Sequence, residues 1–228
     1  MRAVASSSPS VRNTPPETIV SVTDIRPHAS IAAGVSVFAR LPETDSPGRT
    51  RLVRFDLDRE VLAGVQPPLD TSSRVTFGHL RMLARRSDHL FALPAAVELL
   101  SRRDHSEKEL QRKLRSRGFS PGAIALALRR VQEQEYQSDD RFALSWTRYR
   151  MSGKGVSRTA LLAGLARRGV DRETANRAVS AYEEENPDCF SRALRLALQA
   201  LAGEEETTIV RKLARRGFDV VEIRRSLS

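Results

Sequence analysis

The chain has 228 residues, with 38 lysines and arginines against 28 aspartates and glutamates, and a formal net charge of +10. This length can bury a hydrophobic core in one domain or two small ones, and the basic balance favours polyanions or an acidic protein surface as partners. The single cysteine, Cys189, excludes an internal disulfide framework and indicates a reducing compartment. The sequence also lacks the roughly 18 consecutive apolar residues of a membrane helix and the apolar core of a signal peptide, so we expect a cytoplasmic protein.

The N-terminal third of the chain differs in composition from the rest. Residues 1–30 are rich in Ser, Pro and Thr without a clear period, which predicts a disordered leader. Apolar residues then alternate over 35–41 and 53–57, on either side of ETDSPGR, and this period of two predicts a small β-hairpin. Because an isolated hairpin is marginally stable, we expect it to pack on the helices that follow. Residues 31–75 are therefore predicted to be a hairpin extension and linker.

From about Thr76 onward the sequence predicts a succession of short helices. One heptad occurs three times, as KLRSRGF, GLARRGV and KLARRGF, with glycine at positions 118, 169 and 217. Apolar residues lie eight and four positions before each glycine, and six and ten positions after it. This spacing predicts two amphipathic helices joined by a turn. Glycine fits the left-handed position just past the end of the first helix.

Residues that start helices occupy matching places in the three copies. Ser106 and Ser157 precede the first helix of their units, and the sequence predicts that Ser120, Asp171 and Asp219 cap the second helix. In the third unit, three consecutive glutamates take the place of the serine before the first helix.

A further helix is expected upstream of each pair, so the repeating unit has three helices. These upstream helices are predicted over residues 94–103, 140–151 and 189–201. We therefore predict an all-α fold: a tandem array of three three-helix repeats forming a curved, elongated molecule. The predicted repeats occupy residues 76–139, 140–188 and 189–228.

Few side chains are spaced for catalysis or metal binding. The four histidines do not cluster with one another or with Cys189 at the spacing of metal ligands. Asp139 and Asp140 have two interpretations, a general acid–base pair or, more simply, the cap and first-turn acid that open the next helix. The GKG at 153–155 lacks the earlier glycine and the Ser or Thr of a phosphate-binding loop, which favours a flexible loop presenting Lys154. We expect no catalytic activity, no metal and no cofactor.

Basic residues recur beside the three equivalent glycines. A single pair is most simply a solvated helix face, but stacked repeats can bring equivalent positions onto one surface suited to phosphates or an acidic groove. Aromatic residues that could stack on bases are few, and Trp146, Tyr149 and Tyr136 in the middle unit are more typical of packing, so sequence-specific base recognition is not expected. The predicted contact residues are Arg115, Arg117, Lys154, Arg158, Arg167, Arg168, Arg215 and Arg216.

Three segments carry a resemblance to a known family. Residues 96–114 read AVELLSRRDHSEKELQRKL, residues 139–170 read DDRFALSWTRYRMSGKGVSRTALLAGLARRGV, and residues 209–227 read IVRKLARRGFDVVEIRRSL. In this order and at this spacing they resemble the successive signatures of the RecX family, bacterial proteins that modulate RecA recombinase. The resemblance covers about residues 90–228 and does not extend to the Ser/Pro-rich leader.

The resemblance implies a non-enzymatic regulator. Such a protein is expected to bind RecA and the groove of the RecA–single-stranded DNA filament, and to inhibit filament extension, ATP hydrolysis and strand exchange. It would act as a monomer in DNA repair, homologous recombination and the SOS response, with single-stranded DNA as a second direct partner.

The residues themselves leave two alternatives open. One is a general basic helical nucleic-acid-binding module without a RecA partner, which would bind naked nucleic acid as tightly as a filament and with a steep salt dependence. The other is an accessory subunit of an enzyme that uses the helical array as a scaffold.

Overall fold

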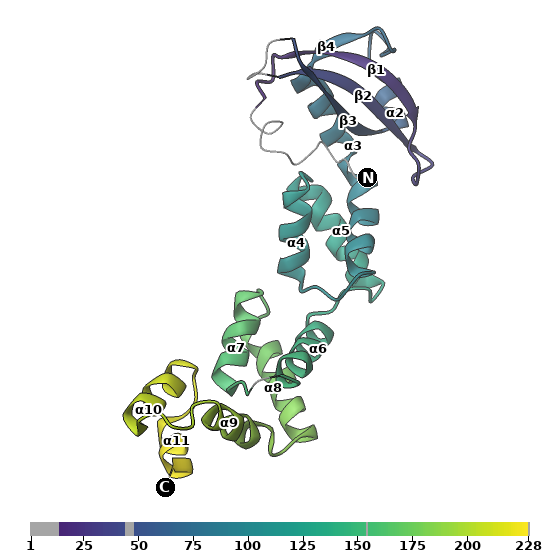
Figure 1. The fold of residues 1–228 in the computed structure, drawn as a ribbon. Coiled ribbons are helices and arrows are strands. Elements are labelled where there is room, and N and C mark those ends of the chain that lie inside the picture. The colour runs from purple at the N-terminus through teal and green to yellow at the C-terminus, as the bar shows by residue number, and fades with distance from the viewer. Residues whose placement is uncertain (1–13, 44–47, 154, 228) are drawn as a thin grey trace. The chain divides into compact units, whose positions relative to one another are not determined.

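The structure is a computed structural model that describes residues 14–43, 48–153 and 155–227 (Figure 1). The chain forms two compact units. The first contains Met1–Arg102 and Leu110–Gln134, and the second contains Arg103–Glu109 and Glu135–Ser228. Within the described residues, no helix is both long enough and apolar enough to span a membrane.

The first unit begins with a four-stranded antiparallel sheet in the order β3-β2-β1-β4. The strands are β1 Ile19–Pro27, β2 Gly34–Pro42, β3 Thr50–Asp58 and β4 Arg74–Thr76. β2 and β3 pair along their whole length, from Gly34 opposite Asp58 to Pro42 opposite Thr50, which confirms the predicted hairpin. The short helix α2, Arg59–Ala63, follows β3 and is capped by Asp58, whose carboxylate accepts a hydrogen bond from the Glu60 N–H.

The prediction of a disordered leader over residues 1–30 is wrong for Ile19–Pro27, because this segment is strand β1, paired with both β2 and β4. The alternation in β1 is interrupted by a bulge between Val22 and Asp24, which shifts the following apolar residue by one position. A strand with a bulge has no continuous period of two. The prediction of disorder therefore rested on the Ser, Pro and Thr content of the segment. The first thirteen residues of the predicted leader lie outside the described residues.

Helix α3, Phe77–Leu100, connects two hydrophobic cores of the first unit. Its first half covers one face of the sheet, where Phe77 meets Phe55 edge-on at 5.7 Å between ring centroids. Its second half packs with α4, Glu107–Ser116, and α5, Pro121–Glu133. The helix predicted over 94–103 is present, but its bounds are wrong: it is the second half of α3, which ends at Leu100 and continues through Pro94. Pro94 is exposed and gives up one backbone hydrogen bond.

The second unit is entirely helical over its described residues. Its helices are α6 Asp139–Met151, α7 Arg158–Arg167, α8 Arg172–Glu185, α9 Cys189–Gln199, α10 Glu206–Arg215 and α11 Val220–Leu227. Each group of three has its own core, one around Leu161 and Leu165 and the other around Leu213 and Ile223. The helices therefore recur in groups of three, as the sequence predicts. The exact repeat boundaries and the curved shape stay predictions.

The repeated heptad forms the same helix end each time. Gly118, Gly169 and Gly217 have φ angles of 96°, 85° and 83°, the left-handed conformation predicted for them. The N–H of the following residue bonds back to the carbonyl five positions earlier, which closes a Schellman turn. The residues that follow the glycines, Phe119, Val170 and Phe218, are all buried in the cores.

Candidate protein and nucleic-acid interface

Two serines join successive repeats through one oxygen atom each. Ser157 Oγ accepts a hydrogen bond from the Ala160 N–H at 3.1 Å, which caps α7, and donates to the Arg216 carbonyl at 2.7 Å. Ser106 Oγ accepts from the Glu109 N–H at 3.1 Å and donates to the Arg168 carbonyl at 2.6 Å. We call each of these contacts a repeat joint. It caps the start of one helix and satisfies a carbonyl at the end of the equivalent helix in the next repeat.

The glycine of each later heptad lies against the repeat joint. A Cβ atom on Gly217 would lie 2.9 Å from Ser157 Oγ and 3.0 Å from the Thr159 Cβ atom. A Cβ atom on Gly169 would lie 2.3 Å from Lys108 Cγ. These two glycines therefore serve both the turn and the close approach of the neighbouring helix. The sequence carries a signal for the joint, since Ser106 and Ser157 each precede a heptad glycine by twelve positions.

Four of the predicted contact residues project freely from helix ends. Arg115 lies in the last turn of α4, Arg167 ends α7, and Arg215 and Arg216 end α10. All four are exposed, and none makes an ion pair with another of the described residues. Their guanidinium groups are therefore available to a partner.

Three other predicted residues have partners within the protein. Arg117 lies 3.3 Å from the Glu98 carboxylate and donates to the Ala95 carbonyl at 3.3 Å. Arg158 is paired with Glu183 and donates to Ser180 Oγ at 3.1 Å, which ties α7 to α8.

Arg168 is the third of these residues and has the most contacts. Its guanidinium lies 4.7 Å from the centroid of the Trp146 ring, donates to the Gly164 carbonyl at 3.1 Å and lies 3.5 Å from the Glu109 carboxylate. Trp146 also fills the space beside Gly164, where a Cβ atom would lie 2.3 Å from the ring. Trp146 is therefore a packing residue.

The GKG loop lies in the second unit between α6 and α7. Lys154 lies outside the described residues, so its predicted role as a contact stays a prediction. Gly155 packs so closely on α9 that a Cβ atom would lie 2.0 Å from the Ala193 carbonyl oxygen. Close packing, and not a need for loop flexibility, therefore requires glycine at position 155.

The two acids at the start of α6 are engaged in structure. Asp139 accepts hydrogen bonds from the Glu107 N–H at 2.8 Å and from Gln137 at 2.7 Å, and burial raises the pKa of its carboxyl. Asp140 lies 2.8 Å from Arg177. The geometry favours the simpler of the two interpretations, with one correction: both aspartates lie in the first turn, and Ser138 is the N-cap. Among the described residues, no group of three acids, histidines or cysteines could hold a metal ion.

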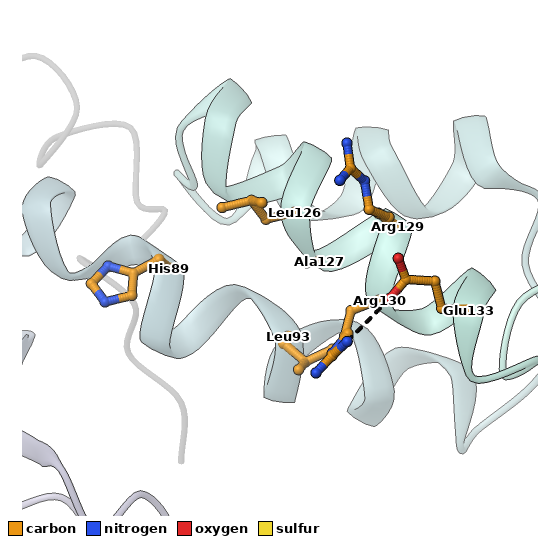
Figure 2. Close-up of a pocket in the computed structure, with 7 residues that line it drawn as sticks. All are labelled: His89, Leu93, Leu126, Ala127, Arg129, Arg130 and Glu133. Atoms are coloured by element: carbon orange, nitrogen blue, oxygen red, sulfur yellow. Dashed lines mark hydrogen bonds and ion pairs between the residues drawn. The ribbon is translucent and has the colours of Figure 1, made fainter.

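A shallow pocket lies between α3 and α5 in the first unit (Figure 2). Its volume is about 340 Å³. Its lining residues are His89, Leu93, Leu126, Ala127, Arg129, Arg130 and Glu133. Figure 2 shows Arg130 paired with Glu133, at 3.2 Å, and Leu126 is 60% exposed. The apolar part of the lining is Leu93, Leu126 and Ala127, and the lining also contains the cations Arg129 and Arg130 but no paired carboxylates or activated nucleophile.

Together these features define a helical-repeat protein carrying a small antiparallel sheet, with unpaired arginines at the ends of its repeated helices. The model of the first three-helix domain of RecX matches residues 92–130, and the model of the second matches residues 138–179. The chain is 37% identical over 142 residues to the regulatory protein RecX of Chromohalobacter salexigens, which covers 58% of this chain and 88% of that protein. It is 34% identical over 126 residues to the regulatory protein RecX of Amycolatopsis mediterranei, covering 53% and 72%. The chain therefore belongs to the RecX family of regulatory proteins.

Two solved structures share the fold. A crystal structure of a regulatory protein RecX superposes with a TM-score of 0.56 at 15% identity, covering 89% of this chain and 96% of that one. The crystal structure of RecX from Lactobacillus salivarius gives a TM-score of 0.53 at 20% identity and covers 60% of this chain and 93% of that one.

Proposed function

We propose that this protein binds RecA and the RecA–single-stranded DNA filament, and that it inhibits filament extension, ATP hydrolysis and strand exchange. Membership of the RecX family is the observation that carries the proposal, since residues 92–130 and 138–179 match its two three-helix domains. A repeated helical surface suits this task, because many weak contacts along a polymer add up to high avidity without a deep pocket.

The proposed contacts are the exposed arginines at the helix ends, together with Lys154. Arg115, Arg167, Arg215 and Arg216 are free of ion pairs with the described residues, so a partner gains their charge without breaking an internal bond. Arg117, Arg158 and Arg168 already have internal partners, and we propose that they hold the helix ends in position.

The test is the single-stranded-DNA-dependent ATP hydrolysis of RecA from the same organism, measured at moderate salt while this protein is titrated up to stoichiometry. We expect inhibition well below one molecule per RecA, because a filament-bound regulator acts on many subunits. Inhibition that appears only when the DNA itself is saturated would contradict a filament regulator.

A charge reversal then tests the contact residues. Arg167→Glu combined with Arg215→Glu is expected to raise the concentration for half-inhibition roughly 10-fold, equivalent to about 1.4 kcal/mol. Arg192→Glu combined with Arg195→Glu is the matched control, since both are exposed arginines of α9 in the second unit, away from the heptad turns. Equal effects of the two double variants would remove the helix-end arginines from the interface.

The net charge of +10 favours one second candidate, a general nucleic-acid-binding module. That candidate predicts equal affinity for naked single-stranded DNA and for the RecA filament. Fluorescence anisotropy with a labelled oligonucleotide, with and without RecA, separates the two functions.

A further inference from the structure

The sheet of the first unit has one covered and one open face. On the covered face lie the alternating residues of the hydrophobic core, packed against α3 and, through Val61 and Leu62, against α2 (Figure 1). Residues of the opposite parity, including Ser21, Arg40 and Leu52, are exposed. Near Ser36 the opposite face is buried, with His28 lying 3.9 Å from the Asp56 carboxylate there, so the open part lies towards the other end of the strands.

The register aligns one row of exposed side chains across all four strands. Arg74 on β4 pairs with Ser21 on β1, Ser21 pairs with Arg40 on β2, and Arg40 pairs with Leu52 on β3. Neighbouring strands lie about 4.8 Å apart, so Arg74 and Arg40 start about 10 Å from each other with the Ser21 hydroxyl between them. We call Arg74, Ser21 and Arg40 the arginine row.

The arginine row carries charge that the sheet does not neutralise. The two acids in the next rows of this face already form ion pairs. Asp24 lies 2.5 Å from Arg26, and Asp56 lies 3.0 Å from Arg54. Arg40 and Arg74 have no acidic partner among the described residues. Two guanidinium groups and a hydroxyl therefore face solvent together, all of them donors of hydrogen bonds.

Charge argues against two occupants of this face. Residues 1–13 carry two arginines and no acid, so this segment offers no charge complementary to the row. A second copy of the sheet would bring arginine against arginine, which is unfavourable for the same reason.

The aromatic ring beside the arginine row indicates which part of a nucleic acid, base or phosphate, this face can bind. Phe38 lies in the row next to Arg40, but the Arg26 guanidinium covers its ring at 4.6 Å from the centroid. A covered ring offers no platform for a base, whereas guanidinium and hydroxyl donors suit phosphate oxygens.

We propose that the arginine row binds the phosphate backbone of nucleic acid without reading its sequence. The site lies outside residues 92–179, which contain both family-model matches, and it needs no RecA, so it goes beyond the proposed function. It gives the protein a nucleic-acid contact in its first unit that is independent of the helix-end arginines.

The experiment measures the affinity of the full chain for a labelled oligothymidine by fluorescence anisotropy over a series of salt concentrations, without RecA. Each neutralised phosphate contributes about 0.7 to the slope of log K against log salt for a single strand. Arg40→Glu combined with Arg74→Glu should therefore weaken binding and reduce the slope by about 1.4. Both replaced side chains are exposed, so we expect the variant to fold, and circular dichroism checks this.

Arg81→Glu combined with Arg85→Glu is the matched control, because both are exposed on α3 of the same unit and make the same change in net charge. An equal loss of affinity and slope in both double variants would overturn the proposal. A methylphosphonate oligonucleotide, whose backbone is uncharged, should bind the wild type and the arginine-row variant alike. If the variant instead loses binding to a polyglutamate peptide and keeps its affinity for oligothymidine, the face is a protein-binding site and the proposal fails.

Discussion

Arg167 and Arg168 are adjacent in the same heptad, yet the fold uses them differently. Arg168 contacts Trp146, the Gly164 carbonyl and Glu109, whereas Arg167 is exposed and makes no ion pair with a described residue. From the sequence alone the two arginines cannot be distinguished, because a cation at either position interacts favourably with the negative end of the helix dipole. Only the tertiary position of the tryptophan separates a packing arginine from one available to a partner.

We therefore expect Arg168→Ala to lower the free energy of unfolding of the second unit by about 1–2 kcal/mol, from the lost cation–π contact and the partly buried pair with Glu109. Arg167→Ala should change it by less than about 0.5 kcal/mol. Denaturant unfolding followed by Trp146 fluorescence measures both. Similar values for the two variants would mean that the Trp146 contact contributes no stability.

Asp139 gives a pH-dependent prediction. Burial raises the pKa of its carboxyl above the ordinary value of 3.8, so the folded state holds this proton more tightly than the unfolded state. Its contribution to stability is then greatest at acidic pH and falls as pH rises from 3.8 through the raised pKa. Asp139→Asn keeps an acceptor oxygen but does not titrate, so its stability relative to wild type should rise with pH across this window. Urea titrations at several pH values test the sign, and a relative stability that falls with pH would contradict it.

At the scale of the helix, the repeat joint explains why serine stands before the first helix of two repeats. Ser157→Ala removes the N-cap acceptor and the donor to the Arg216 carbonyl, and should cost about 1–3 kcal/mol. Glu205→Ala is the control, because Glu205 is the N-cap at the equivalent position of the next repeat but its side chain makes no capping bond. Thermal unfolding should separate the two variants clearly, and an equal loss for both would refute a stabilising role for the joint.

The glycine at the joint should tolerate substitution even less. Gly217→Ala places a Cβ atom in a left-handed conformation and within 2.9 Å of Ser157 Oγ, so we expect a loss of about 2–4 kcal/mol. Gly153→Ala, where a Cβ atom would meet no atom within 4 Å, should be close to neutral. The difference in unfolding midpoint between the two variants is the measurement.

The elements that the sequence predicted well share a local cause. The glycine turns follow from amphipathic spacing and backbone chemistry within a few residues, so Gly118, Gly169 and Gly217 could be assigned from the sequence. Strand β1 could not, since its bulge breaks the alternation and its partners β2 and β4 are distant in sequence. The recurrence of serine twelve positions before a heptad glycine marks where the repeat joint lies. Its long-range bond could not be predicted, because a serine that caps its own helix gives no local sign of a second acceptor.

At the scale of the whole molecule, the buried hydrophobic residues of the part that the structure describes form four separate clusters, two in each unit. Repeat proteins with local cores unfold in parts more readily than proteins with one core. Leu213→Ala should therefore destabilise its own cluster by about 2–5 kcal/mol. Hydrogen exchange should show faster amide exchange over α9–α11 and unchanged exchange over β1–β4, whereas an equal change in both would indicate one cooperative unit.

The reactivity of Cys189 provides a second measurement of local unfolding over α9–α11. Its side chain is buried, and burial raises the pKa of its thiol, so the reactive thiolate is scarce in the folded protein. The rate of its reaction with a disulfide reagent should increase in Leu213→Ala and stay unchanged in a variant of the first unit such as Leu83→Ala.

The repeat joint also depends on which side chain precedes the first helix of a repeat. The position twelve residues before Gly217, which holds serine in the two preceding repeats, holds Glu205 in the third. An ionised carboxylate has no hydrogen to donate, so it cannot bond to the carbonyl at the end of another helix as Ser106 and Ser157 do. The third repeat therefore lacks the hydroxyl donor that the first two repeats use at this position, and Glu205→Ser would supply it.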